Sequence, residues 1–168
     1  MVKKKESPPP ALMAVRILTL DYLIDGYVED QALWPAAGTQ LTSVRLEPTG
    51  SLVPPASTAA NWLLLSTTPV VAGIPRDAAS EAYLRKRYDT EFPLPVQMYV
   101  GPYLIQGKLL RRDATTDPFK LAATYKQAVL VQEAVIDCLL PGARLKQLSA
   151  PLALVRTEHL LQGMVLLQ

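Results

Sequence analysis

The chain has 168 residues, of which 49% are hydrophobic and 19% are charged, and its formal net charge is +2. Seventeen basic residues against fifteen acidic ones are too evenly balanced to indicate a nucleic-acid partner by bulk charge, so only a local basic patch could serve one. No apolar run approaches the roughly 20 residues of a membrane span, and a single cysteine excludes a disulfide within the chain.

Residues 1–12 contain three lysines and then three consecutive prolines, where a signal peptide needs an apolar stretch. We expect this segment to be a disordered tail. The lone Cys138 suits a reducing compartment, and the expected location is the cytoplasm, without contact to a membrane. Because Cys138 follows an apolar run, we expect it to be a small buried residue.

Residues 13–76 are expected to form the first of two small β-rich units. The fifteen prolines of the chain oppose long helices and favour short strands joined by irregular loops. A turn is expected at Asp21, between the first two strands. The apolar patterns predict strands at residues 15–20, 22–29, 41–46, 62–65 and 70–71.

Residues 77–92 are expected to form a linker helix. Asp77 stands where an N-cap accepts hydrogen bonds from the main chain, and Glu81 lies in the first turn. Arg85-Lys86-Arg87 fill the last turn, where the helix dipole favours cations. A solvated helix face is the simpler interpretation of this basic run, and nucleic-acid contact is the alternative.

Residues 93–168 are expected to form the second unit. Gly101-Pro102 has the chemistry of a turn, since glycine supplies freedom in φ and proline then fixes it. Asp117-Pro118 is typical of a helix N-cap followed by proline at the first helical position. Strands are predicted at residues 96–100, 103–111, 128–136, 153–156 and 160–167.

Two heptapeptides are similar: residues 22–28 read YLIDGYV, and residues 103–109, which lie 81 positions later (103 − 22), read YLIQGKL. Both copies keep the glycine, Gly26 and Gly107, but not the residue before it. A two-residue hairpin turn would need a suitable partner for glycine in both copies. We therefore expect each glycine to mark a bend inside one long strand, where it allows tight coiling and close backbone approach.

The second unit resembles the Sm-like proteins, whose fold is a strongly bent five-stranded barrel with SH3-type topology. The first Sm motif is matched by a strand at residues 96–100 followed by Gly101, Gly107, Leu109 and Asp113. The second motif is matched by the apolar-Arg segment Leu154-Val155-Arg156. The expected fold is therefore mostly β, with two tandem small Sm-like or SH3-like barrels joined by a short helix.

This resemblance implies self-assembly. The open ends of a small barrel expose strand edges, and Sm-like units hide such edges by pairing edge to edge into rings. We expect a homo-oligomer, with a closed ring as one form, in which residues 164–167 of the apolar final strand are paired. The expected function is a non-enzymatic assembly or protein-interaction module without a cofactor or a metal ion.

A second interpretation is weak binding of single-stranded RNA or another nucleic acid. The candidate residues are Arg156, Arg111, Arg112 and Tyr103. They combine cations for phosphate with a ring on which a base can stack. RNA-binding Sm-like proteins use an asparagine and an Arg-Gly pair for this purpose, whereas Asp117 and Thr157 stand at the corresponding positions here. A carboxylate faces phosphate unfavourably.

A third interpretation is a small-ligand or enzyme site at the seam between the units, where Asp25, Tyr22 and His159 would have to converge. His159 is the only histidine, so a metal site made of paired histidines is excluded. Trp34 and Trp62 are expected to fill the cores, because each unit is otherwise poor in large rings.

Overall fold

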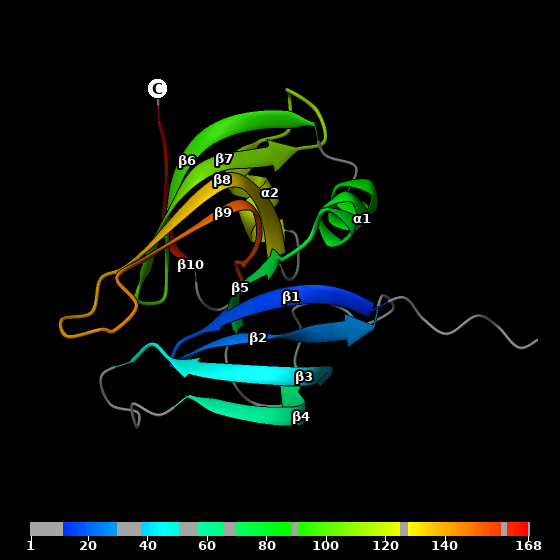
Figure 1. The fold of residues 1–168 in the computed structure, drawn as a ribbon. Coiled ribbons are helices and arrows are strands. Elements are labelled where there is room, and N and C mark those ends of the chain that lie inside the picture. Colours follow the sequence, from blue (N-terminus) through cyan, green and yellow to red (C-terminus); the bar gives the residue numbers. More distant parts are fainter. Residues whose placement is uncertain are drawn as a thin grey trace, which may run out of the picture.

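The computed structural model describes residues 12–29, 38–50, 57–65, 70–88, 91–124, 128–158 and 161–167. Within these ranges the chain forms ten β-strands and two short helices (Figure 1). All ten strands belong to one sheet, and each strand runs antiparallel to its neighbours. The prediction of a mostly β protein is confirmed.

The elements follow one another in two groups of five strands. The first group consists of β1 (Leu12–Thr19), β2 (Tyr22–Glu29), β3 (Thr39–Pro48), β4 (Thr58–Leu65) and β5 (Val70–Pro75). The helix α1 (Ala78–Tyr88) leads to the second group. That group consists of β6 (Phe92–Val100), β7 (Tyr103–Arg111), α2 (Pro118–Thr124), β8 (Ala128–Cys138), β9 (Gln147–Arg156) and β10 (Leu161–Leu166).

Both groups have the same strand order within the sheet, which runs β10-β6-β7-β8-β9-β5-β1-β2-β3-β4. In each group the fifth strand pairs with the first, and the second, third and fourth strands follow. The groups meet at β5 and β9, where Ala72 pairs with Val155 and Gly73 pairs with Leu154. The two expected units are therefore joined in two ways: covalently through α1, and by main-chain pairing of β5 with β9. We call this pairing the β5–β9 junction.

The pairing register of the first group recurs in the second group. This correspondence extends over all four strand pairs within each group, including the positions of the register shifts. We call residues that occupy the same place in the two groups counterparts. Examples of matched pairs are Val15–Gly26 with Val96–Gly107, Val44–Ala60 with Ala134–Ala150, and Ile17–Gly73 with Met98–Met164.

The two glycines of the repeated heptapeptide lie inside strands and opposite a β-bulge, not in hairpin turns. Each pairing register shifts at the glycine, at Gly26 between β2 and β3 and at Gly107 between β7 and β8. The bulged strands contain Ser43 and Glu133, which both have positive φ, 50° and 52°. A Cβ at Gly107 would lie 2.8 Å from the carbonyl oxygen of Gln132, so the backbones approach too closely for a side chain.

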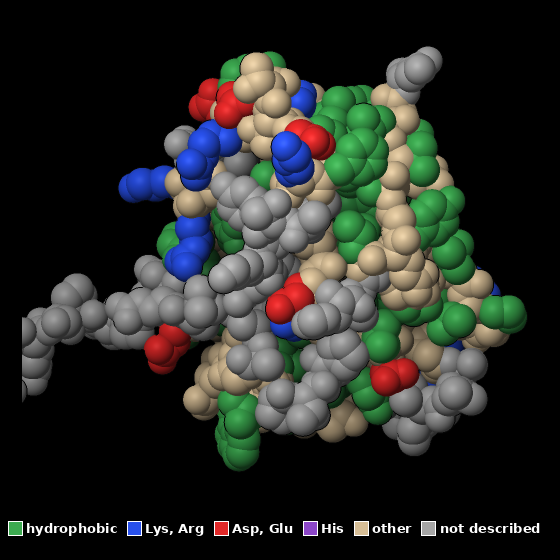
Figure 2. All heavy atoms as spheres, turned by 180° about the vertical axis from the view of Figure 1, so that it is seen from behind, with side chains coloured by type: hydrophobic (Ala, Val, Ile, Leu, Met, Phe, Trp, Pro, Cys, Tyr) green, Lys and Arg blue, Asp and Glu red, His purple; other side chains and the backbone are tan. Residues whose placement is uncertain are grey.

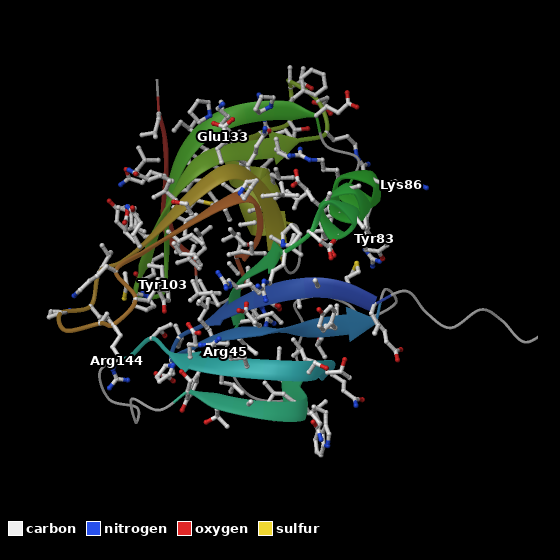
Figure 3. All side chains as sticks on the ribbon, viewed as in Figure 1. Arg45, Tyr83, Lys86, Tyr103, Glu133 and Arg144 are labelled. Carbon is white, nitrogen blue, oxygen red and sulfur yellow. The ribbon has the colours of Figure 1, made fainter. Side chains whose placement is uncertain are left out.

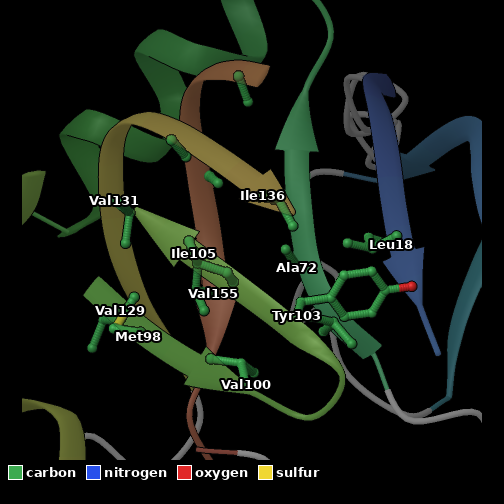
Figure 4. Close-up of a cluster of buried hydrophobic side chains, with 14 of the residues drawn as sticks. Leu18, Ala72, Met98, Val100, Tyr103, Ile105, Val129, Val131, Ile136 and Val155 are labelled. Carbon is green, nitrogen blue, oxygen red and sulfur yellow. The ribbon is translucent and has the colours of Figure 1, made fainter. Parts of the chain in front are cut away.

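Buried side chains form two hydrophobic clusters, and each cluster draws residues from both groups. The first cluster centres on β6 to β9 and includes Leu18 and Ala72 from the first group (Figure 4). The second centres on β1 to β3 and includes Leu152 and Leu154 from β9. Alternate side chains of β9 therefore enter different clusters: Ala153 and Val155 lie in the first, and Leu152 and Leu154 lie in the second. The face of β9 that points away from its own group is thus buried by the first group. Neither group has a hydrophobic core entirely of its own.

Both helices begin at an aspartate cap. The backbone N–H of Ser80 donates to Asp77 Oδ1 at 2.7 Å, and this hydrogen bond lowers the pKa of Asp77. The N–H of Phe119 donates to Asp117 Oδ1 at 2.9 Å at the start of α2. Leu84 fixes α1 in place because its side chain is buried in the second cluster.

Some expectations fall on residues that the structure does not describe. Apart from Leu12, the expected tail lies outside the described residues, as do Trp34 and His159. Cys138 was expected to be buried, but it is half-buried at the end of β8. No helix in the described part of the chain is both long enough and apolar enough to cross a membrane.

Candidate functional site

The sheet ends in two open strands, β4 and β10, which have no further strand partner within the described part of the chain. Neither strand contains a charged residue: β4 reads TAANWLLL and β10 reads LQGMVL. Natural edge strands are commonly protected by charged side chains or by proline. These two uncharged edges lack that protection, so each is able to accept another strand.

Large apolar side chains are exposed on both open strands. Trp62 and Leu64 of β4 are 65% and 51% exposed, and Val165 of β10 is 50% exposed. Figure 2 shows hydrophobic side chains on both sides of the exposed backbone of β10, below the C-terminus. The expectation that Trp62 fills a core is therefore wrong, because alternation along β4 directs its side chain outward.

The exposed residues of β4 have buried counterparts at the β5–β9 junction. Trp62 occupies the place of Leu152, since they pair with the matched residues Thr42 and Gln132. Leu64 likewise occupies the place of Leu154. Both β9 leucines are 0% exposed, because the first group covers the outward face of β9. The equivalent outward face of β4 has no such cover among the described residues.

The same contrast holds on β10. Val165 occupies the place of Ile74, which is only 5% exposed because β9 lies beside β5. Leu161 occupies the place of Val70, which is fully buried, whereas Leu161 is half-buried. On both open strands, apolar side chains are thus exposed at positions whose counterparts are buried at the β5–β9 junction.

The prolines of β6 limit the open edge on this side to β10. The ladder between β10 and β6 ends where Leu166 pairs with Val96. The part of β6 that precedes Val96 in the sequence extends beyond this ladder, and it contains Pro93 and Pro95. Proline has no N–H to donate, so this extension of β6 is a poor template for another strand.

Tyr103 is a core residue, which contradicts its expected role in stacking on a nucleic-acid base. Its side chain is 1% exposed in the first cluster, and its hydroxyl donates to the carbonyl oxygen of Thr19 at 3.1 Å (Figure 4). Burial raises the pKa of Tyr103. Tyr103 begins β7 whereas Arg111 ends it, so the two residues lie about 26 Å apart along the strand.

Two of the three candidate arginines contact neighbouring groups, and the third lines a pocket. Arg111 Nη1 donates to the carbonyl oxygen of Ala114 at 2.9 Å, which ties Arg111 to the loop after β7. Arg156 Nη2 contacts the carboxylate of Glu158 at 3.4 Å. Arg112 lines a small apolar pocket between α2 and the end of α1. Because Tyr103 is buried, the four candidate residues do not form one basic and aromatic surface.

The basic run of α1 forms a solvated helix face. Arg85 bonds to Glu81 at 2.8 Å, and Arg87 donates to the hydroxyl of Tyr83 at 2.8 Å. Figure 2 shows basic side chains along the side of the molecule where α1 lies, and Figure 3 shows Lys86 pointing away from the body of the protein. This placement matches the simpler interpretation of the run.

Asp25 joins two arginines on the first group. Arg16 donates to both carboxylate oxygens, from Nε at 2.7 Å and from Nη2 at 2.8 Å, and Arg76 Nη1 lies 3.3 Å away. The hydrogen bonds to Asp25 raise the pKa of Arg16. In the second group the counterparts are Gln97 and Gln106, which share a neutral hydrogen bond of 3.1 Å. The ion pair therefore has a matched neutral equivalent in the same molecule.

We expect Asp25→Ala to lower the free energy of unfolding by about 1.5–3 kcal/mol, because it removes hydrogen bonds between charged groups and leaves two arginines side by side. The matched variant Gln106→Ala removes a neutral hydrogen bond and should cost only about 0.5–1.5 kcal/mol. Urea unfolding followed by circular dichroism measures both. Equal losses for the two variants would contradict a stabilising role for the ion pair.

Asp25 is the acidic residue that the seam interpretation requires, and it contacts two arginines. Because Asp25 is held by Arg16 and Arg76, its carboxylate is committed to a structural ion pair. Tyr22 lies at the start of β2 and packs against the second cluster. In the part of the chain that the structure describes, no three His, Cys, Asp or Glu side chains gather as metal ligands.

Comparison of the chain with protein-family models, with curated proteins and with solved structures finds no match.

Proposed function

We propose that this protein is a non-enzymatic self-assembly module, made of two tandem Sm-like or SH3-like small barrels, which forms homo-oligomers through the open edges of its sheet. The observation that carries the proposal is the contrast between counterparts. Trp62, Leu64 and Val165 are exposed on open strands, whereas Leu152, Leu154 and Ile74 are buried at the junction inside the chain.

Hydrophobic burial supplies the driving force for this assembly. Burial of one large aliphatic side chain stabilises a contact by about 1.5–3 kcal/mol. Both open strands also carry unpaired main-chain groups that a neighbouring strand would satisfy. An interface that combines apolar contacts with a main-chain ladder is specific as well as stable, because the ladder fixes the register of the side chains.

The matched registers support the tandem arrangement. Each group has the strand order fifth-first-second-third-fourth, which is the order in an SH3-type barrel, and each has a glycine bend in its second strand. The register shifts at Gly26 and Gly107 support this arrangement, because a β-bulge bends a strand and so favours the coiling that a small barrel needs. A scaffold role also fits the chemistry of the surface, because Asp25, Arg111 and Arg156 serve local structure.

Light scattering coupled to size-exclusion chromatography tests the proposal. At micromolar concentration we expect a molar mass that is a multiple of the 18.4 kDa chain mass, and we expect it to fall on dilution. Added single-stranded oligonucleotide at low salt should leave the elution unchanged. A monodisperse 18.4 kDa species at micromolar concentration would overturn the proposal.

A further inference from the structure

We infer that a hollow beside the β-bulge of the first group binds a small oxyanion, namely a phosphate or a carboxylate group. The hollow opens to solvent between β3 and β4. Its lining residues are Ser43, Val44, Arg45, Ala59, Ala60 and Asn61. None of them is among the large exposed side chains that carry the proposed assembly, so this site is a separate feature of the molecule.

The second group has a hollow in the equivalent place, between β8 and β9. Its lining residues are Glu133, Ala134, Val135, Ser149, Ala150 and Pro151. Each of these six residues is the counterpart of one residue of the first hollow, because Val44–Ala60 and Ala134–Ala150 are matched pairs of the two ladders. The hollow is therefore a property of the fold, and the two copies differ in the chemistry of the lining.

Three side chains of the first hollow can donate hydrogen bonds to an oxyanion: Arg45, Ser43 and Asn61. The side chains of Ser43 and Asn61 make no hydrogen bond within the described residues. Arg45 Nη2 lies 3.0 Å from Glu47 Oε1, but these two side chains are 66% and 43% exposed. An ion pair so exposed is weak, and it leaves the other guanidinium donors of Arg45 available to a ligand.

The second hollow has no positive group among its lining residues. At the three positions equivalent to the donors stand Glu133, Val135 and Pro151. Figure 3 shows Arg45 on the first group and Glu133 on the second. The carboxylate of Glu133 is paired with Lys108 at 2.8 Å, and it would repel an oxyanion that entered this hollow. The second hollow is thus a matched control within the same chain.

The charges around the first hollow also favour an anion. Asp25 pairs with Arg45 across β2 and β3, but the carboxylate of Asp25 is already engaged by Arg16 and Arg76. Three arginines therefore face two carboxylates, those of Asp25 and Glu47, which leaves one positive charge. The equivalent positions of the second group hold one carboxylate and no arginine; they are Gln97, Gln106, Val135, Asp137 and Leu167.

Self-assembly through β4 would leave the hollow open. The counterpart of β4 is β9, which is paired with β5 inside the chain. Although β9 is paired on both sides, Ser149 and Pro151 of the second hollow remain exposed. The first hollow is therefore accessible in a single chain and in an assembly, and oxyanion binding does not depend on the proposed function.

Protection of Arg45 from phenylglyoxal, a reagent that modifies exposed guanidinium groups, tests this inference. The full chain is treated in chloride, phosphate or acetate at equal ionic strength, and peptide mass mapping gives the modification rate of each arginine. We expect phosphate or acetate to slow the modification of Arg45 at least about fivefold relative to chloride. Arg112, which is exposed in the second group, should change less than about twofold. The phosphate and acetate samples show which oxyanion binds more tightly.

Two variants make the test specific to the hollow. Asn61→Ala removes one donor and keeps Arg45, so the oxyanion concentration that half-protects Arg45 should rise about threefold to tenfold. Glu133→Ser with Val135→Arg gives the second hollow two of the three donors. Serine suits this position because Ser43 and Glu133 have nearly the same φ, 50° and 52°. The guanidinium introduced at residue 135 should then be protected as Arg45 is.

Equal modification of Arg45 in all three salts would overturn the inferred site, whether or not the protein assembles. A monomeric protein in light scattering would overturn the proposed function and leave this site in place. Should the double variant lose the wild-type circular dichroism spectrum, Asn61→Ala decides by itself, because Asn61 is an exposed residue. An unchanged half-protecting concentration in Asn61→Ala would contradict binding in this hollow.

Discussion

Replacing Leu64 by lysine is expected to dissociate the assembled protein into 18.4 kDa monomers at micromolar concentration. The substitution removes about 1.5–3 kcal/mol of hydrophobic burial per contact and places an ammonium group against an apolar cluster. The dissociation constant should therefore rise at least about 100-fold. Val165→Lys should have the same effect from the opposite edge. Light scattering at a series of concentrations measures both variants.

A matched control separates loss of assembly from a general effect of added charge. Leu139 is 52% exposed and Leu64 is 51% exposed, but Leu139 lies in the loop between β8 and β9 and belongs to neither open strand. Leu139→Lys should leave the molar mass unchanged. The variants should also keep the wild-type circular dichroism spectrum, because Leu64 and Val165 are solvent-exposed within one chain. A Leu64→Lys protein that remains assembled would contradict the proposed interface.

Gly107→Ala is expected to lower the free energy of unfolding by about 2–3 kcal/mol, which for a chain of this length corresponds to about 4–12 °C in melting temperature. The added Cβ would lie 2.6 Å from Val131 Cγ1 and 2.8 Å from the carbonyl oxygen of Gln132. The valine side chain can turn, but the carbonyl belongs to the ladder between β7 and β8. Relief therefore requires a backbone shift at the bulge.

Gly26→Ala is the matched variant in the first group and should change stability by no more than about 0.5 kcal/mol. Its nearest contacts would be 3.2 Å, to Leu41 Cδ2 and to the carbonyl oxygen of Thr42. That small strain is offset because alanine restricts the unfolded chain and so stabilises by about 0.4–1 kcal/mol. Urea unfolding at one fixed protein concentration compares the two variants, since assembly makes stability concentration-dependent. A larger loss at Gly26 than at Gly107 would contradict the geometry of the two bends.

Local patterns located most of the strands. The strand expected at residues 41–46, within a stretch rich in turn-forming residues, is β3. The segment expected at residues 153–156 is only the end of β9, which begins at Gln147. Its first half contains Ser149 and Pro151 and so has a weak apolar pattern. Pairing with β8 makes it a strand, and that contact between distant segments has no local signal.

For two aromatic residues, the side of the strand expected from the sequence differs from the side that the structure shows. Trp62 was assigned to the interior on the grounds of size, yet a strand presents alternate residues to opposite faces, and Trp62 faces outward. Tyr103 was assigned to a surface because arginines follow in the same strand. Its alternation with Ile105 in the repeated heptapeptide already indicated an inward position.

The open edges were only partly visible in the sequence. The expectation that residues 164–167 need a partner came from the resemblance to Sm-like proteins. The other open strand, β4, is not among the edges expected from the sequence, although its segment has eight residues without a charge. An apolar, uncharged strand segment is compatible with a central strand as well as with an edge strand. Its position in the sheet decides between them.

By itself, the sequence determined where the chain extends, where it must bend and which heptapeptide recurs in similar form. Strand propensity, turn chemistry and the lack of a side chain on glycine act within a few residues, so they can be read locally. Only the tertiary structure decided that β5 pairs with β9 and that β4 and β10 stay open. Main-chain hydrogen bonds are nearly independent of side-chain identity, and the alternation of apolar residues identifies a buried face without identifying what covers it.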